Sequence, residues 1–189
     1  MHNCCFVVCL VLRPYVTDCT VLMMQKIDED GDFFDKVWAD FKAGFGDVTG
    51  RYWLGNDQIH ELTKDGGYKL RVDLEAYDGP YQTQTTWFWA EYTTFVVGNE
   101  ASNYVVMIDG YSGDSGNILA EINGTQFTTY DRDNDGYNFN CAGNIYGGFW
   151  HDDDCVQCAI TGGNGYFNCE SLSAVDKKLK KSQMWLQCK

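Results

Sequence analysis

Residues 68–76 read YKLRVDLEA, a stretch in which apolar and polar side chains alternate without interruption. Successive side chains of a strand point to opposite faces, so this pattern predicts a strand with one buried and one exposed face. Two segments rich in aromatic and β-branched residues follow, at 85–97 (TTWFWAEYTTFVV) and 104–110 (YVVMIDG). We expect one or two strands in the first segment and one in the second. Strands that follow one another through short turns indicate an antiparallel sheet.

Two short helices are expected before these strands. Residues 35–44 (DKVWADFKAG) place their apolar side chains at helical spacing, and Gly44 is a suitable stop. Residues 56–63 (NDQIHELT) predict a second helix, with Asn56 or Asp57 as its N-cap. A few short helices beside an antiparallel sheet define the α+β fold class.

The texture of the sequence changes after residue 110. Gly, Asn, Asp and Ser dominate there, and regular periodicity fades until residues 178–187 (KLKKSQMWLQ). This last segment alternates well enough to predict a closing strand. A loop-rich region of this kind needs stabilisation from outside a core, and the sequence offers clustered cysteines and a run of carboxylates.

The charge balance narrows the classes of partner. The chain has 189 residues, with 14 Lys and Arg against 27 Asp and Glu, which gives a net charge of −13. This charge argues against nucleic acids and anionic membrane surfaces, because their phosphates would be repelled. The apolar run at 4–12 (CCFVVCLVL) is too short to span a bilayer, and no other candidate span exists. It is either a signal-like segment or a buried strand.

Nine cysteines indicate disulfide bonds in an oxidising compartment, because no Cys and His spacing typical of zinc is present. Nine is an odd number, so at least one thiol is free, intermolecular or in a segment removed on maturation. Residues 123–125 (NGT) form an N-glycosylation sequon, which fits a surface turn of a secreted glycoprotein.

Residues 129–141 (TYDRDNDGYNFNC) carry the strongest local signal for chemistry. Asp131, Asp133 and Asp135 alternate, and a glycine follows them. Closely spaced carboxylates on a tight loop suit calcium, which prefers oxygen ligands. The stretch is not an EF-hand, because the twelfth position from Asp131 is Ala142 instead of Glu. The alternative interpretation is a solvated acidic turn.

Patterns typical of catalysis are weak. His60 falls within a predicted helix, where packing or capping explains it. His151 precedes three aspartates, which makes a hydrolytic Asp/His site the enzymatic alternative. No Ser lies in a G-x-S-x-G turn, so we expect a protein that is not an enzyme.

Several motifs in this order resemble the fibrinogen-related domain of ficolins, tachylectins, angiopoietins, tenascins and the fibrinogen chains. The resemblance runs from about residue 20 to residue 150 and returns near the C-terminus. The motifs are KAGFG at 42–46, WLGNDQIH at 53–60, KLRVDL at 69–74, GYSGDSGN at 110–117, NGTQFTTYDRDNDGYNFNC at 123–141 and KKSQMWL at 180–186.

This resemblance implies a secreted, extracellular recognition domain with a twisted antiparallel central sheet and a loop-rich, calcium- and disulfide-stabilised C-terminal subdomain. An atypical segment would occupy residues 1–19, the fibrinogen-related domain residues 20–189, and its binding subdomain residues 110–178. The N-terminal part is shorter than is usual in the family.

The resemblance also implies a calcium site. Its ligands would be the side chains of Asp133 and Asp135 and the main-chain carbonyls of Tyr137 and Phe139. Asp131 would then lie outside the ligand shell or reach the ion through water.

A disulfide between Cys141 and Cys155 is implied next to this site. In lectin-like members of the family an acetyl group binds beside that disulfide, close to an unusual cis peptide bond, which here would join residues 154 and 155. The residues implied at the pocket are Asp154, Cys155, Ile145 or Tyr146 as one wall, and Tyr166. An apolar slot with a few amide donors suits an N-acetyl group.

The chain departs from the family around this pocket. Val156 stands where acetyl binders often have His, and residues 152–154 add three negative charges to a slightly longer loop. The segment between Tyr166 and the last strand is shorter than usual and lacks an aromatic wall.

Two functions are compatible with these observations. The first is a calcium-dependent, lectin-like pattern-recognition domain of innate immunity that binds acetylated, N-acetylglucosamine-like sugars on glycans or microbial surfaces. The second is an extracellular protein-interaction domain of the angiopoietin or tenascin kind, in which calcium is purely structural and a basic partner is favoured. Oligomerisation is compatible with either function.

Overall fold

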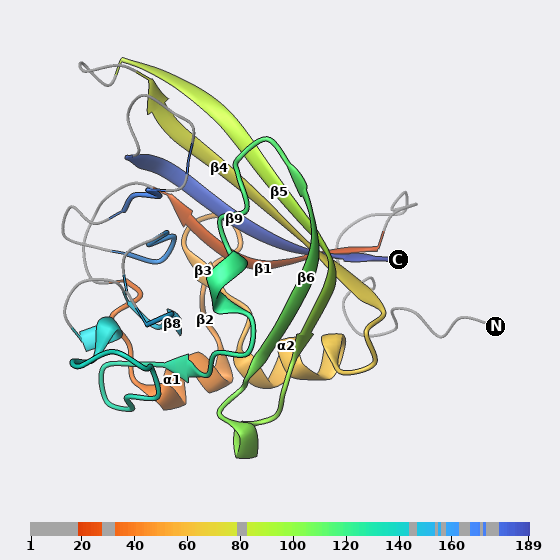
Figure 1. Cartoon of the computed structure of the whole chain (residues 1–189), viewed down its shortest axis with the longest axis vertical. Coiled ribbons are helices and arrows are strands. Elements are labelled where there is room, and N and C mark those ends of the chain that lie inside the picture. The colour runs from red at the N-terminus through yellow and green to blue at the C-terminus, as the bar shows by residue number, and fades with distance from the viewer. Residues whose placement is uncertain are drawn as a thin grey trace.

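In the part of the chain that the structure describes, a seven-stranded antiparallel sheet crosses the molecule in the order β2-β3-β1-β9-β4-β5-β6 (Figure 1). The structure is a computed structural model. It describes residues 19–27, 33–78, 83–143, 147–153, 155, 158–162, 167–170, 172 and 178–189. The apolar run at 4–12 lies outside the described residues.

The strands of the large sheet are β1 (Thr20–Ile27), β2 (Phe45–Gly46), β3 (Tyr52–Trp53), β4 (Tyr68–Asp78), β5 (Gln84–Val97), β6 (Val106–Gly113) and β9 (Leu179–Cys188). A separate pair of short strands is formed by β7 (Phe127–Thr128) and β8 (Phe149–Trp150). The expected α+β class and the antiparallel sheet are therefore confirmed.

Strand β4 has the one-sided burial that its sequence predicts. Leu70, Val72 and Leu74 are fully buried, and the residues between them are partly exposed. Segment 85–97 forms one continuous strand rather than two. The predicted C-terminal strand exists as β9, but it lies in the middle of the sheet, between β1 and β4. The alternation of a half-buried strand is the same at the edge and at the centre of an antiparallel sheet, so the pattern could not reveal this position.

The two predicted helices are present as α1 (Trp38–Ala43) and α2 (Asn56–Thr63). Helix α1 ends at Gly44, whose φ of 90° is in the region that favours glycine. The N-cap of α2, however, is Gly55, and the prediction of Asn56 or Asp57 as the cap is wrong.

Tertiary contacts explain why neither side chain caps α2. Asn56 is buried, and its Oδ1 accepts a hydrogen bond from Trp53 Nε1 at 3.0 Å. Asp57 Oδ1 accepts a hydrogen bond from the hydroxyl of Tyr104 at 2.6 Å. Both side chains are thus used by residues outside the first turn of the helix.

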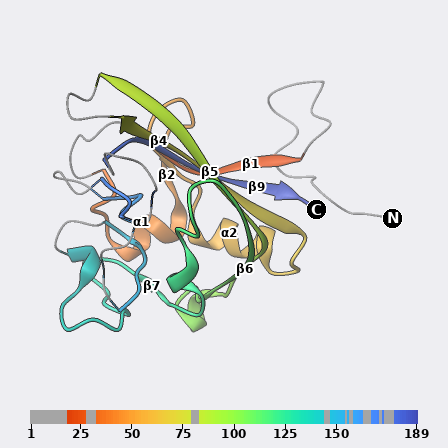
Figure 2. The ribbon, with the colours of Figure 1, turned by 45° about the horizontal axis from the view of Figure 1, so that its top comes forward.

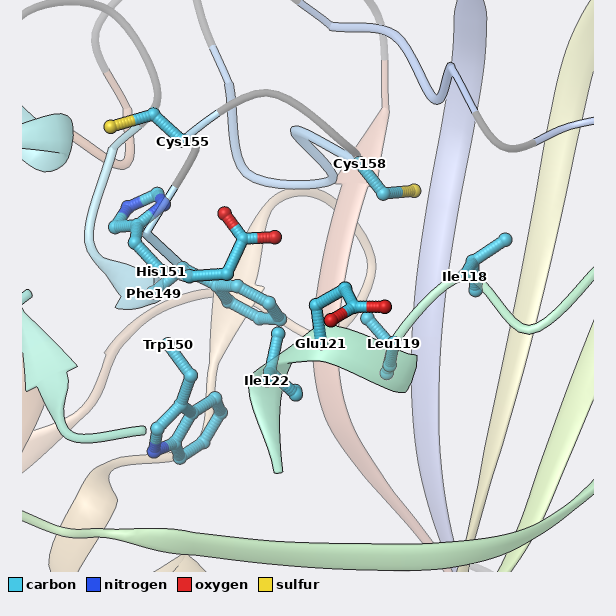
Figure 3. Close-up of a pocket in the computed structure, with 10 residues that line it drawn as sticks. Ile118, Leu119, Glu121, Ile122, Phe149, Trp150, His151, Cys155 and Cys158 are labelled. Carbon is cyan, nitrogen blue, oxygen red and sulfur yellow. The ribbon is translucent and has the colours of Figure 1, made fainter. Parts of the chain in front are cut away.

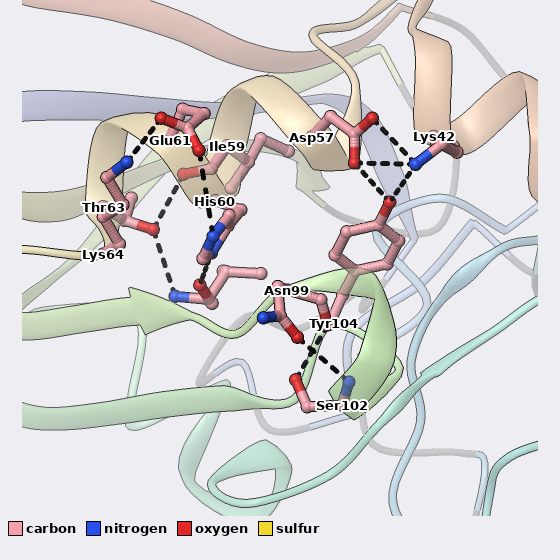
Figure 4. A network of polar contacts seen from close by, with 11 residues as sticks. Lys42, Asp57, Ile59, His60, Glu61, Thr63, Lys64, Asn99, Ser102 and Tyr104 are labelled. Carbon is pink, nitrogen blue, oxygen red and sulfur yellow. Dashed lines mark hydrogen bonds and ion pairs between the residues drawn. The ribbon is translucent and has the colours of Figure 1, made fainter.

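A polar network joins the two helices to Tyr104, which follows the short 3₁₀ helix η1 (Glu100–Ser102) (Figure 4). Lys42 Nζ lies 2.9 Å from Asp57 Oδ2 and 2.7 Å from Glu100 Oε2. The hydrogen bonds with Glu100 and then Asp57 raise the pKa of Lys42 above its ordinary value. The network is partly exposed, so its main effect is to orient the helices.

Aromatic side chains form the part of the core beneath the C-terminal loops, which gather at the end of the sheet near α1 (Figure 2). The ring of Trp150 lies 5.0 Å from that of Phe127 and 6.1 Å from that of Trp53, and Phe41 of α1 packs 5.1 Å from Phe127. Strands β7 and β8 are therefore anchored to α1 and β3. The loop-rich region is therefore stabilised by packing in the main core, in addition to the disulfides and the carboxylate loop that its sequence predicts.

Candidate functional site

The loop at 129–141 is fastened to helix α1 by Asp131. Asp131 Oδ1 accepts hydrogen bonds from the main-chain nitrogen of Trp38 at 2.8 Å and from Thr129 Oγ1 at 2.7 Å. Val37, the N-cap of α1, supplies no side-chain cap of its own. The guanidinium of Arg132 lies 3.9 Å from the centre of the Trp38 ring. Asp131 thus caps a distant helix and is engaged away from the proposed ligand set.

We expect Asp131→Ala to lower the free energy of unfolding by about 1 kcal/mol, because Trp38 N–H loses its acceptor. Asp131→Asn keeps an oxygen acceptor and should lose only part of this stability. Urea denaturation of both variants, in the presence of chelator, measures the effect without any contribution from metal. Equal stability of Asp131→Ala and the wild type would contradict the capping role.

The next residues of the loop bring two carboxylates together. Asp135 accepts hydrogen bonds from the main-chain nitrogens of Tyr137 at 3.1 Å and Cys141 at 3.0 Å. Burial raises the pKa of Asp135 above its ordinary value, and the adjacent Asp133 carboxylate contributes in the same direction. Among the described residues, neither carboxylate forms an ion pair with a cationic side chain. Two such carboxylates form a suitable start of a cation site.

Tyr137 and Phe139 follow these carboxylates in the loop, and their side chains are exposed to solvent. The rings of Tyr137 and Phe139 are 36% and 50% exposed and lie 4.5 Å apart, so they occupy the solvent side of the loop. In the described part of the chain, no group of three or more His, Cys, Asp or Glu side chains could hold a metal ion. A calcium site here would therefore need main-chain oxygens beside Asp133 and Asp135, as in the ligand set that the resemblance implied.

One disulfide connects this loop to the region that follows it, and a second disulfide lies within that region. Cys141, at the end of the loop, is bonded to Cys155, which is the pairing that the resemblance implied. Cys158 is bonded to Cys169 and closes a second, shorter loop. Asp135 contacts Cys141 N–H, so the acidic loop is linked covalently, within a few residues, to Cys155.

A pocket lies beside Cys155 (Figure 3). One wall comes from the 3₁₀ helix η2 (Ala120–Ile122) and the residues before it, and the other from β8 and the residues after it. The lining residues are Ile118, Leu119, Glu121, Ile122, Phe149, Trp150, His151, Asp152, Cys155 and Cys158. Apolar side chains and polar groups contribute about equally to the exposed lining, and the carboxylates of Glu121 and Asp152 carry negative charge.

His151 is a buried member of this lining. One ring nitrogen, Nε2, lies 2.8 Å from the carbonyl oxygen of Gly147. Burial lowers the pKa of His151 to about 4, against smaller opposing effects of Gly147 and Asp152. The ring is therefore neutral at pH 7, and its hydrogen bond to a carbonyl suits a structural role better than proton transfer to a substrate.

The structure describes only one of the residues that the resemblance implies at the acetyl pocket. Cys155 lines it, but Asp154, Ile145, Tyr146 and Tyr166 lie outside the described residues. Sequence reasoning missed the wall at 118–122. The signal was present as the apolar residues of NILAEI, directly after the glycine-rich turn, where regular periodicity is already lost.

The glycosylation sequon lies next to that wall. Asn123 is exposed in a turn, and its Oδ1 accepts a hydrogen bond from the main-chain nitrogen of Ile108 at 3.0 Å. The position is thus on the surface, as the sequence predicts for a sequon.

Two curated relatives are similar to most of this chain. Techylectin-5A of Tachypleus tridentatus is 38% identical over 146 residues, which is 77% of this chain and 47% of that protein. Angiopoietin-4 of Bos taurus is 35% identical over 146 residues, which is 77% of this chain and 27% of that protein. The chain thus spans about half or less of the length of these relatives.

The fold is also similar to that of a solved structure. The fibrinogen-like globe domain of human ANGPTL2 superimposes with a TM-score of 0.76 at 31% identity, over 88% of this chain and 79% of that one. Residues 16–187 match the family described as fibrinogen beta and gamma chains, C-terminal globular domain. This match covers most of the sequence and both halves of the candidate site. The chain therefore belongs to the fibrinogen C-terminal globular domain family.

Proposed function

We propose that this chain is a secreted, calcium-dependent, lectin-like recognition domain that binds acetylated sugars in the pocket beside Cys155. The observation that carries the proposal is a pocket with both apolar and polar lining, next to a disulfide whose other cysteine ends the acidic loop. The name of one relative, a techylectin, supports the lectin class. The disulfides support an oxidising, extracellular location. The domain would bind its ligand without any enzymatic step.

Calcium would be held by the carboxylates of Asp133 and Asp135 and by the carbonyls of Tyr137 and Phe139. The residues fit the ion because the two carboxylates interact, one is partly buried, and neither has a cationic partner among the described residues. Bound calcium would supply the positive charge that relieves their repulsion. Asp135, through its hydrogen bond with Cys141 N–H, would pass this order on to the disulfide.

The pocket has a volume of about 20 Å³, which is room for about one methyl-sized group, and its lining is partly apolar and partly polar. Ile118, Ile122 and Phe149 can surround a methyl group, which gains from leaving water. An amide N–H beside that methyl would find an acceptor in the carboxylate of Asp152. An N-acetyl group has both features.

The acidic rim favours a second candidate function, recognition of a basic extracellular protein. Glu121 and Asp152 line the pocket, and the chain carries a net charge of −13. Such a surface attracts cationic partners and repels acidic glycans. The similarity to an angiopoietin supports this class. No helix among the described residues is long and apolar enough to cross a membrane.

Calorimetric titration of N-acetylglucosamine into the protein tests the first proposal. We expect saturable heat with calcium present and none with chelator, and none with glucosamine, which lacks the acetyl group. Absence of heat in every state, in a protein whose melting temperature still rises with calcium, would contradict sugar binding and leave a protein partner.

A variant of the exposed rim residue Glu121 separates the two functions. Glu121→Lys reverses one charge without removing an apolar wall. We expect it to leave the affinity for a neutral acetylated sugar within about threefold, because no ionic bond is lost. Binding of a basic partner should instead fall by about tenfold or more, as is typical when a rim charge repels its partner. A tenfold loss of sugar affinity would contradict the proposed acetyl slot.

A further inference from the structure

The side chain of Asp153 lies against Gly136 of the acidic loop, in the space that a side chain at position 136 would enter. Its Oδ1 is 2.0 Å, and its Cγ 3.0 Å, from the place where a β-carbon of residue 136 would stand. The backbone of Gly136 is not in the left-handed region, so its conformation does not require glycine. A side chain at this position would require the exposed Asp153 carboxylate to move, because the carboxylate fills the volume that the side chain would need.

This contact brings a third carboxylate to the loop that holds Asp133 and Asp135. Gly136 directly follows Asp135, and Asp153 precedes Cys155, the second cysteine of the Cys141–Cys155 disulfide, by two residues. Asp153 belongs to the acidic stretch that lengthens the segment between the two cysteines. In the described part of the chain, none of these three carboxylates forms an ion pair with a cationic side chain. Like charges collected in this way are unfavourable without a cation.

We propose that Asp153 is a charge-contributing residue of the calcium site and that it couples this site to the pocket. The inference rests on the proposed binding of calcium by the loop. Asp153 acts through its charge and not as a third ligand, because the described residues contain no three-carboxylate group that could hold an ion.

The coupling follows from chain connectivity. Asp152, the preceding residue, lines the pocket, and Cys155 lines it two residues later. When calcium neutralises the loop, the attraction of Asp153 to the ion holds residues 149–153 against Gly136. When calcium is absent, repulsion by Asp133 and Asp135 opposes the same contact. The rim of the pocket would therefore be ordered by calcium through Asp153.

Calcium titration calorimetry on the whole chain tests the inference, with Asp153→Asn as the main variant and Asp65→Asn as a control. Asp65 is an exposed residue between α2 and β4, so its replacement makes the same change in net charge far along the chain from the loop. We expect Asp153→Asn to weaken calcium binding by about three- to tenfold at low salt, and Asp65→Asn by less than about twofold.

Ionic strength separates charge from structure. The Asp153 side chain is exposed, so the difference between Asp153→Asn and the wild type should shrink to less than about twofold in 1 M salt. A loss of affinity that persists unchanged at high salt would show a packing defect and overturn the inference. Equal affinities of Asp153→Asn and the wild type at low salt would also overturn it. A wild type that binds no calcium would instead overturn the proposed calcium site itself.

A steric cycle provides independent evidence for the contact with Gly136. Gly136→Ala should weaken calcium binding, because its β-carbon would displace the Asp153 carboxylate. The same substitution in an Asp153→Ala background should have a much smaller effect, because the clash is gone. Additive effects of the two substitutions would contradict the contact.

Discussion

Replacing Trp150 by alanine is expected to lower the free energy of unfolding by about 4 kcal/mol, the largest single effect we predict. Trp150 is 1% exposed and packs on Phe127 and Trp53. Its Nε1 also donates a hydrogen bond of 2.7 Å to the carbonyl of Tyr104. Alanine would leave a cavity and an unsatisfied carbonyl at the junction between the sheet and the C-terminal loops. Urea denaturation followed by circular dichroism measures the loss.

Trp87 provides the matched control. It is also a tryptophan, but it lies on β5 with 49% of its side chain exposed. Trp87→Ala should cost less than about 1 kcal/mol, because little packing is lost. Similar losses for the two variants would contradict the claim that the C-terminal loops share the main core. Trp150 also lines the pocket, so any ligand affinity should fall with its replacement.

Acidification from pH 6.5 to pH 4 is expected to remove about 3 kcal/mol of stability through His151 alone. The pKa of this ring is about 4 in the folded protein, against an ordinary value of 6.5. Between these two values the unfolded state binds more protons than the folded state. Stability therefore falls as the pH is lowered through this window, and the contribution of His151 is complete above the unfolded pKa.

The variant His151→Gln isolates this contribution from that of the carboxylates. Glutamine keeps a polar group near the Gly147 carbonyl and does not titrate. The difference in free energy of unfolding between wild type and variant, measured at intervals from pH 4 to pH 7.5, should grow in favour of the wild type as the pH rises. Two parallel curves would show that His151 titrates alike in both states and would contradict its burial as a neutral ring.

The local elements could be predicted because their causes are local. The alternation at 68–76 produced β4, and Gly44 ended α1 because its backbone adopts a positive φ. The cap of α2 could not be predicted in this way. Asn56 and Asp57 have side chains that can cap a helix. Their oxygens instead accept hydrogen bonds from Trp53 and from the distant Tyr104.

The candidate site also has features that the local sequence predicts and others that depend on tertiary contacts. The spacing of Asp131, Asp133 and Asp135 indicated a cation loop but could not rank its three carboxylates. The family resemblance implied that Asp131 lies outside the ligand set. The tertiary structure gives a physical reason, because Asp131 Oδ1 accepts a hydrogen bond from the main-chain nitrogen of Trp38, which is far away in the sequence. The wall of the pocket at 118–122 has no periodicity, so only the fold could bring it beside Cys155.

By itself, the sequence determined which segments form strands and helices, which region is rich in loops, and which family the chain resembles. Those properties depend on side-chain alternation, on backbone preferences and on motifs that are contiguous in the chain. The tertiary structure alone decided that β9 lies at the centre of the sheet, and that Asp153 fills the space above Gly136. Both arrangements join residues that are distant in sequence, and such contacts are selected by packing and charge in three dimensions rather than by any local preference.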